Sequence, residues 1–350
     1  MKSIFGMTLE EMQAEFSAQN LEKYRAKQVA EWLYKKFAKS FSDMTNLPKD
    51  LRAALGAKYR IEMPTLRTRL ESADGRTSKF LLVFPDGASV ESVLMRQPYG
   101  NSICISTQAG CNMGCTFCAS TLHGLARNLT AGEMLAEVLF IEEMLSKEGE
   151  KVDTMVLMGS GEPLMNYDNV VCFLRLLHEK YVLNMGYRNI TLSTSGIVPA
   201  IDDLAEEGMP ITLSISLHAP CEELRTDLMP INRKYPLADV VAAGRRYAEK
   251  TGRRVTYEYI LIRDLNDGER EARELAKLLK GQTASVNLIP VNPVPERGFE
   301  RPTDESVASF CSILAHHRIT ATVRREMGSD IQAACGQLRS RHMSAEEKLQ

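Results

Sequence analysis

The chain has 350 residues, of which 44% are hydrophobic and 25% are charged, and its formal net charge is −2. These fractions are typical of a globular protein, and the length exceeds one ordinary domain. No apolar run approaches the ~20 residues that a membrane helix needs, and the first residues lack the apolar segment of a signal peptide.

The eight cysteines favour a reducing compartment over a disulfide framework in a chain of this length, so we expect a cytoplasmic protein. Because the chain is not basic overall, binding of nucleic acid would depend on local patches. The candidate patches are Arg245-Arg246, Arg253-Arg254, Arg324-Arg325, and Arg339 with Arg341.

Residues 1–62 are predicted to be a small helical domain. Its helices are expected over 9–18, 26–37 and 48–57, and the spacing of Trp32, Leu33 and Phe37 gives one apolar face. Both a packing unit and a nucleic-acid-docking module are consistent with this pattern. Residues 63–100 are predicted to form a β-hairpin extension, with strands over 65–72, 79–84 and 89–95 separated by Asp-Gly turns.

Strands alternate with helices from residue 103 onward. The expected strands are 103–107, 154–158, 190–193, 211–216, 255–261, 285–289 and 320–324, and the expected helices are 131–146, 169–181, 198–207, 237–250, 267–279 and 304–317. About six βα units predict an α/β fold whose parallel sheet closes wholly or partly into a barrel over residues 101–343. Residues 344–350 are expected to be a polar tail.

Three cysteines follow the first of these strands closely, at Cys111, Cys115 and Cys118. Three thiolates on one loop can hold three irons of a [4Fe–4S] cluster, since Cys thiolates are the usual ligands of such clusters. The fourth iron is then open to the amino and carboxylate groups of S-adenosylmethionine (SAM). A structural zinc site, with Cys104 or His123 as its fourth ligand, is the alternative.

Polar residues and glycines follow several of the predicted strands. In a barrel, the loops at the carboxyl ends of the strands carry the reactive groups, so we expect these residues to bind SAM. They are Gly161 and Glu162 after the second strand, Ser193 at the third, Ser216, Leu217 and His218 at the fourth, and Asn292 after the sixth.

Two further cysteines differ from the ordinary buried kind. Cys104 lies in the first barrel strand, and Cys335 lies beside Gly336 in a segment without helical periodicity. A flexible loop with an accessible thiol would present Cys335 as a reactive group.

The chain resembles the RlmN family, radical-SAM methyltransferases of C2 of adenine in 23S rRNA and tRNA, over almost its whole length. The matching strings are Gln108-Ala109-Gly110-Cys111, Cys118-Ala119-Ser120-Thr121, Gly161-Glu162-Pro163-Leu164, Ser216-Leu217-His218-Ala219, Leu228-Met229-Pro230-Ile231-Asn232, Ala334-Cys335-Gly336-Gln337-Leu338 and, near the N-terminus, Phe41-Ser42-Asp43-Met44-Thr45-Asn46-Leu47. The resemblance implies a radical-SAM partial (β/α)6-type barrel.

The resemblance also implies a covalent mechanism that consumes two SAM molecules. Cys335 would accept a methyl group from the first SAM, and the second SAM would yield a radical that activates this methyl for addition to C2. Glu91 aligns with the residue that removes the C2 proton. Cys104 would then attack the Cys335 sulfur, so that a disulfide forms and the methylated RNA is released.

The implied partners are 23S rRNA, tRNA modified at the adenosine 3′ of the anticodon, a flavodoxin- or ferredoxin-like electron donor and a thiol reductant. A monomer without membrane association is expected. The N-terminal helices would grip RNA, and the arginines Arg324, Arg325, Arg339 and Arg341 would contact phosphates.

Three rival functions share part of this pattern. A Cfr-type enzyme, which methylates C8 of adenine and confers antibiotic resistance, has the same cysteines, but Pro163 after Glu162 favours the C2 enzyme. A non-catalytic iron–sulfur protein that binds RNA or transfers electrons would need no Cys335. A radical-SAM activase of a protein glycyl site would have no use for Cys104 and Cys335.

Overall fold

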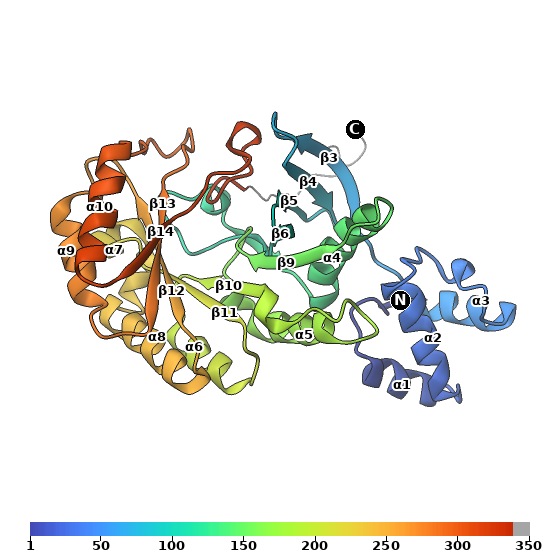
Figure 1. The fold of residues 1–350 in the computed structure, drawn as a ribbon. Helices are drawn as coiled ribbons and strands as arrows, with labels where there is room; N and C mark the ends of the chain where they lie inside the picture. The colour runs from blue at the N-terminus through green and yellow to red at the C-terminus, as the bar shows by residue number, and fades with distance from the viewer. Residues whose placement is uncertain (339–350) are drawn as a thin grey trace.

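A ten-stranded sheet forms the centre of the molecule in the computed structural model, which describes residues 1–338 (Figure 1). Its strands are β3 (Thr65–Glu71), β4 (Thr77–Val83), β5 (Ser89–Gln97), β6 (Gly100–Ile105), β9 (Val152–Leu157), β10 (Ile190–Thr194), β11 (Thr212–Ser216), β12 (Val255–Leu261), β13 (Ala284–Pro290) and β14 (Thr320–Val323). They lie in the order β14-β13-β12-β11-β10-β9-β6-β5-β4-β3, so the sheet is open, with β14 and β3 as its edges.

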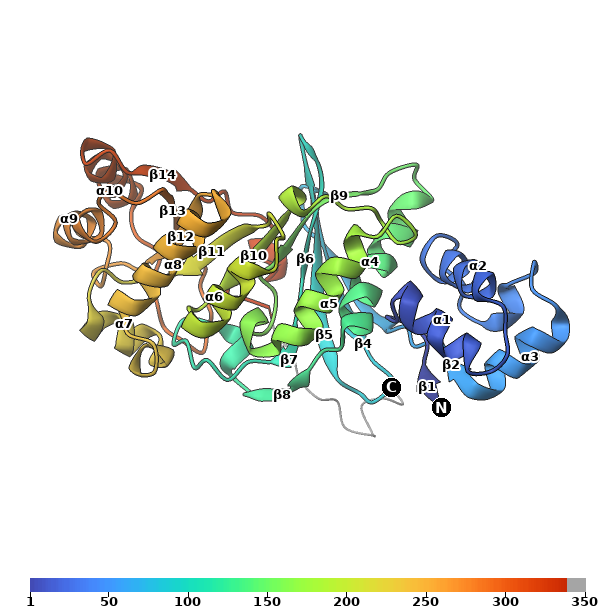
Figure 2. The ribbon, with the colours of Figure 1, turned by 90° about the horizontal axis from the view of Figure 1, so that it is seen from below.

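The part of the sheet from β6 to β14 is parallel and confirms the predicted βα alternation. The helices that join and cover its strands are α4 (Ala131–Ser146), α5 (Tyr167–His178), α6 (Val198–Glu206), α7 (Glu222–Leu228), α8 (Leu237–Thr251), α9 (Glu269–Leu278) and α10 (Asp304–His316). They pack on the outer face of the curved sheet (Figure 2). The short helix α7 was not predicted, because seven residues give too little periodicity.

The helix α4 has the predicted bounds, 131–146, because the residues at its start form a capping box. Thr130 accepts a hydrogen bond from the N–H of Glu133, and the Glu133 carboxylate accepts one from the N–H of Thr130. This capping box satisfies two N–H groups that the first helical turn leaves without partners. Apolar residues then bury most of the helix against β6 and β9.

The strands β3, β4 and β5 extend the sheet in antiparallel fashion beyond β6. The register places Val93 opposite Cys104 and Lys79 opposite Val93, so the three side chains lie on one face of the sheet. β3 is exposed along its whole length, and its charged side chains suit an edge strand because they oppose pairing with another chain.

The N-terminal segment forms α1 (Leu9–Ser17), α2 (Lys23–Tyr34) and α3 (Lys49–Lys58), which lie beside α4 and α5 (Figure 1). The helix α2 ends three residues before its predicted end, and Phe37, with a φ of +53°, has left the helical conformation. A parallel pair of two-residue strands, β1 (Lys2–Ser3) and β2 (Tyr59–Arg60), was not predicted, since two residues show no alternation. The Tyr181 hydroxyl accepts a hydrogen bond from the N–H of Leu9.

Among residues 1–338, no helix combines the length and apolarity needed to cross a membrane. The predicted tail at 344–350, Arg339, Arg341 and the last residues of the predicted barrel segment 101–343 lie outside the described residues.

Candidate active site

A short β-ribbon that the sequence did not predict holds the three-cysteine loop. Its strands are β7 (Gln108–Gly110) and β8 (Leu125–Asn128), which pair in antiparallel fashion on either side of the loop. Gly110 has a φ of +82°, and a Cβ atom there would lie 1.9 Å from the carbonyl oxygen of Gly124. Glycine is therefore required where the two strands meet at the start of the loop.

The three cysteines line one cavity of about 150 Å³. Cys111 and Cys115 are buried and Cys118 is half-buried. Burial raises the pKa of all three thiols, that of Cys111 to about 12. Thiolates at these positions therefore need positive charge beside them, which the irons of a cluster provide.

A single metal ion fits this loop less well than a cluster. Within the described residues, no three His, Cys, Asp or Glu side chains converge as the ligands of one ion do. The proposed fourth zinc ligands are also misplaced, since His123 is exposed and Cys104 lines a different cavity. A cubane cluster binds each thiolate through a separate iron, so the donor set fits the cluster.

Glu162 projects into the same cavity from the turn after β9. It accepts hydrogen bonds from the N–H of Ser195 at 2.6 Å, the hydroxyl of Thr194 at 2.7 Å and the N–H of Leu164 at 3.0 Å. Burial raises the pKa of Glu162, and these donors oppose the rise. The carboxylate is thereby fixed in orientation and suited to accept hydrogen bonds from an ammonium group.

Gly161, just before it, has a φ of +109°, and a Cβ atom there would lie 2.6 Å from the Cβ of Gln108. The chain turns this closely only with glycine, and the turn brings the backbone to the wall of the cavity.

The carboxyl ends of β10, β11 and β13 supply the remaining predicted residues. Ser193, Ser216, His218 and Asn292 line the cavity with the cysteines and Glu162. Leu217 does not line it, because its side chain is buried in the hydrophobic core.

His218 is held as a neutral ring. Burial lowers its pKa to about 3, and its Nδ1 accepts a hydrogen bond from the N–H of Ile260 at 2.9 Å. The ring also packs edge-on against Phe117, with centroids 4.8 Å apart. The proton of the neutral ring is therefore on Nε2, which can act as a donor.

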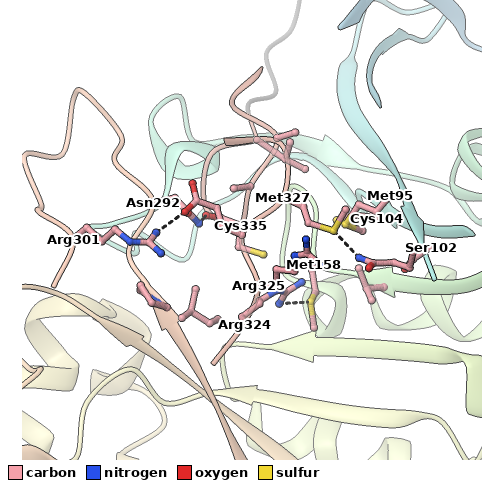
Figure 3. A pocket seen from close by; sticks show the side chains of 18 of the residues that line it. Met95, Ser102, Cys104, Met158, Asn292, Arg301, Arg324, Arg325, Met327 and Cys335 are labelled. Atoms are coloured by element: carbon pink, nitrogen blue, oxygen red, sulfur yellow. Dashed lines mark hydrogen bonds and ion pairs between the residues drawn. The ribbon is translucent and has the colours of Figure 1, made fainter. Parts of the chain in front are cut away.

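A second cavity, of about 350 Å³, holds Cys104 and Cys335 (Figure 3). Cys104 enters it from β6, and Cys335 enters from the loop after β14. Both are free thiols. The two cavities are adjacent, because five residues line both: Met158, Ile289, Asn292, Arg324 and Cys335. Cys335 thus lies at the boundary between the cavity of the three cysteines and the cavity of Cys104.

Arg324 is half-buried near both thiols, with its guanidinium beside Met158 (Figure 3). Its guanidinium is 3.3 Å from the Glu258 carboxylate, which also accepts a hydrogen bond from Ser193 at 2.8 Å. Burial raises the pKa of Cys335 and raises that of Cys104 to about 12, and the charge of Arg324 opposes both shifts. The Arg324 guanidinium is thus paired within this site, with its side chain 25% exposed, and its contact with RNA phosphate stays a prediction.

Several contacts anchor the loop that carries Cys335. The Asn292 amide donates to the carbonyl oxygen of Cys335 at 3.0 Å, and the N–H of Ala119 donates to that of Gly336 at 2.8 Å. On the far side, the N–H of Ala73 donates to the Asp330 carboxylate at 2.8 Å. The loop therefore bridges β13, the cysteine loop and the antiparallel extension.

Glu91 lies on the same face of the sheet as Cys104, since Val93 opposes Cys104 and is two residues from Glu91. It does not line either cavity; its carboxylate is 3.0 Å from Lys79 Nζ. Sequence reasoning missed Lys79, Glu258 and the inward position of Arg324. For Glu258 the sequence did carry one signal, because a glutamate in the mostly apolar strand β12 indicates a buried charge with a partner.

The chain matches two family models. Residues 105–276 match the family model of the Radical SAM superfamily, and residues 2–61 match that of the ribosomal RNA large subunit methyltransferase N-terminal domain. Membership of the superfamily implies a [4Fe–4S] cluster and SAM as cofactors.

Several relatives match almost the whole chain. A probable dual-specificity RNA methyltransferase RlmN of Symbiobacterium thermophilum is 56% identical over 96% of this chain and 91% of that protein. One of Geobacillus kaustophilus is 50% identical over 99% and 94%. The crystal structure of a radical SAM methyltransferase from Sphaerobacter thermophilus superposes with a TM-score of 0.93, at 45% identity over 97% of this chain and 99% of that one. The chain therefore belongs to the RlmN family of radical-SAM RNA methyltransferases.

Proposed function

We propose that the protein methylates C2 of an adenosine in 23S rRNA and of the adenosine 3′ of the anticodon in tRNA, through a methyl group carried on Cys335. The observation that supports this most directly is the position of Cys335, which lines both the cluster cavity and the cavity of Cys104. A thiol in that position can accept a methyl group on one side and be resolved by a second thiol on the other.

Cofactor binding is assigned to residues that line one cavity. Cys111, Cys115 and Cys118 would ligate the cluster, and the SAM contacts would come from Gly161, Glu162, Ser193, Ser216, His218 and Asn292, with Leu217 contributing only its main chain. When bound, the cluster and SAM supply a one-electron reductive cleavage of SAM, which activates a methyl group for transfer to an unreactive carbon. Glu162 would hold the SAM ammonium, and the Nε2–H of His218 would donate a hydrogen bond.

The protein's own residues would carry the covalent steps. The Cys335 sulfur, with its thiolate favoured by Arg324, would take a methyl group from one SAM, and a second SAM would be consumed in each turnover. Glu91 would accept the proton from C2 of adenine as a base. The Cys104 thiolate would then attack the Cys335 sulfur, so that the S–S bond forms, the S–C bond breaks and the released carbon takes a proton.

The remaining partners follow from this chemistry. A flavodoxin- or ferredoxin-like protein would supply electrons, a thiol reductant would restore the two cysteines, and the cytoplasm would keep both thiols reduced. We assign RNA docking to residues 1–62, treat 63–100 as an extension of the catalytic barrel, and take the enzyme to be a monomer. Arg325, which is exposed at the cavity of Cys335, is the arginine we assign to phosphate contact.

One experiment tests both the substrate and the position of methylation. Anaerobically reconstituted enzyme is given SAM, a reductant and either a 23S rRNA fragment or tRNA, and the digested RNA is compared with methyladenosine standards. We expect 2-methyladenosine from both RNAs. A product of 8-methyladenosine would assign the Cfr-type reaction instead, and cleavage of SAM without any methylated RNA would contradict the proposed substrate.

A further inference from the structure

Lys79 is a buried cation that the steps above leave without a role. It lies on β4, and its side chain is 8% exposed. A lysine is rarely buried to this degree unless its charge is paired and its hydrogen bonds are made.

Two groups from distant parts of the chain surround the Lys79 ammonium. Its Nζ atom lies 3.0 Å from the carboxylate of Glu91 on β5 and donates a hydrogen bond to the carbonyl oxygen of Gln332 at 3.1 Å. Glu91 is itself only 12% exposed. Lys79 therefore connects the proposed base directly to the loop that carries the proposed methyl acceptor.

The strand register places Lys79 and Glu91 on the same face of the sheet as Cys104. Lys79 opposes Val93, which opposes Cys104, so Lys79, Glu91 and Cys104 all extend from one face of the sheet. Gln332, three residues before Cys335, has a φ of +52°, which is uncommon for a residue other than glycine. The contact with Lys79 contributes to holding this residue in that conformation.

Holding the loop in place does not depend on Lys79 alone. Asp330 accepts a hydrogen bond from the N–H of Ala73, the Gln97 amide contacts the Met327 sulfur, and Asn292 binds the carbonyl of Cys335. Lys79 differs from these residues because it contacts both the loop, at the Gln332 carbonyl, and the carboxylate of Glu91. Since other residues already anchor the loop, the contacts of Lys79 point to a role in placing Glu91 relative to the loop.

We propose that Lys79 is a positioning residue, which fixes the Glu91 carboxylate relative to the Cys335 loop so that the base reaches C2 of the adenine while the substrate is joined to Cys335. The inference rests on the proposed function and assigns a residue that acts through Glu91 without touching the RNA. Loss of Lys79 is therefore expected to slow removal of the C2 proton while methyl transfer to Cys335 continues.

The test compares Lys79→Met, Lys79→Arg and, as a matched control, Arg67→Met, which removes an exposed cation from the neighbouring strand β3. The readouts are the methylated fraction of Cys335, measured by peptide mass spectrometry, and the rate of RNA release with protium or deuterium at C2 of the target adenine. Since a general base contributes about 10²–10⁴-fold, we expect Lys79→Met to slow release at least about tenfold and to show a deuterium isotope effect larger than that of the wild type. Lys79→Arg should recover part of the rate.

A double variant covers the case in which Lys79→Met fails to fold because Glu91 is left as an unpaired buried charge. Adding Lys79→Met to Glu91→Gln removes both charges and should slow release no further than Glu91→Gln alone, because Lys79 acts through Glu91. Additive effects in the double variant, methyl loading that falls in step with turnover, or a Lys79→Met rate equal to that of Arg67→Met would overturn the proposal. If the wild type yields no 2-methyladenosine, the proposed function fails instead.

Discussion

The side-chain amide of Asn292 donates a hydrogen bond to the main-chain carbonyl of Cys335, with 3.0 Å between nitrogen and oxygen. The bond joins the end of β13 to a loop 43 residues further along the chain. It places the Cys335 thiol at the mouth of the cluster cavity without using the thiol itself as an acceptor. The sulfur therefore remains available for chemistry while its backbone is held.

Replacing Cys335, the proposed methyl acceptor, should stop the reaction at its first step. Cys335→Ala is expected to abolish both methyl loading and RNA methylation, because Cys335 is the only free thiol among residues 1–338 that lines both cavities. Loading is measured with radiolabelled methyl-SAM on the purified protein. Loading that persisted at another residue would contradict the assignment of Cys335.

Replacing the resolving thiol should stop the reaction at its last step. In Cys104→Ala the methyl group is loaded and transferred, but the bond between Cys335 and the RNA carbon is not broken, so a covalent protein–RNA complex should accumulate. Denaturing gel electrophoresis detects it as a slowly migrating species. Normal turnover by Cys104→Ala would exclude the resolving role.

Removing one cluster ligand should remove the cluster. Cys111→Ala is expected to lose bound iron and the brown absorption after anaerobic reconstitution, because only two protein thiolates of the loop remain. Cys172→Ala is a suitable control, since Cys172 lies on α5 and lines neither cavity. Iron retained by Cys111→Ala at the control level would contradict the ligand set.

The substitution Gly161→Ala should impair SAM binding more than the substitution Gly208→Ala. Both glycines have positive φ angles, which cost other residues of the order of 1–3 kcal/mol. Only at Gly161 does the added Cβ meet another atom within 3 Å, whereas nothing lies within 4 Å at Gly208. Equilibrium dialysis should show at least about a tenfold loss of SAM affinity for Gly161→Ala, as expected when a ligand turn is displaced, and little change for Gly208→Ala.

Glu137 should make the stability of the fold depend on pH. Burial raises its pKa from 4.5 to about 8, so the folded protein retains a proton that the unfolded chain releases. The free energy of unfolding should therefore fall by up to about 1.4 kcal/mol per pH unit as the pH rises from 4.5 to 8. Denaturant titrations at pH 6 and pH 8.5 should show a smaller difference for Glu137→Gln than for the wild type, whereas the exposed control Glu305→Gln should behave as the wild type does.

Local patterns predicted most of the barrel correctly. The helix at 131–146 and the strand at 255–261 match their predicted ranges, because a capping box marks the start of the helix and β-branched and aromatic residues dominate the strand. The ribbon of β7 and β8 was missed because Gly110 and its neighbours show no alternation, and its pairing depends on the fold around the cysteine loop.

The positions of Arg324 and Lys79 could not be predicted from the sequence, because they depend on contacts between distant segments of the chain. Arg324 resembles a surface arginine in sequence, and only its approach to Glu258 and Cys335 shows that it faces inward. Lys79 is equally inconspicuous among the charged residues near the hairpin turns. Its partners, Glu91 and Gln332, are 12 and 253 residues away in the sequence. The periodicity of a local segment cannot predict contacts over such separations.

The open order of the sheet, with β14 and β3 as separate edges, has a consequence for the kind of molecule that can be modified. A ribosomal RNA has no free end near most of its nucleotides, so a target in mid-chain can enter a catalytic chamber only through a side. A fully closed barrel would restrict entry to small molecules and chain ends. Among the described residues, the loop that carries Cys335 follows β14 and contacts Ala73 just after β3, so it spans part of the gap between the two edges. We therefore expect a target in mid-chain to enter beside this loop, next to the cavity that Cys335 lines.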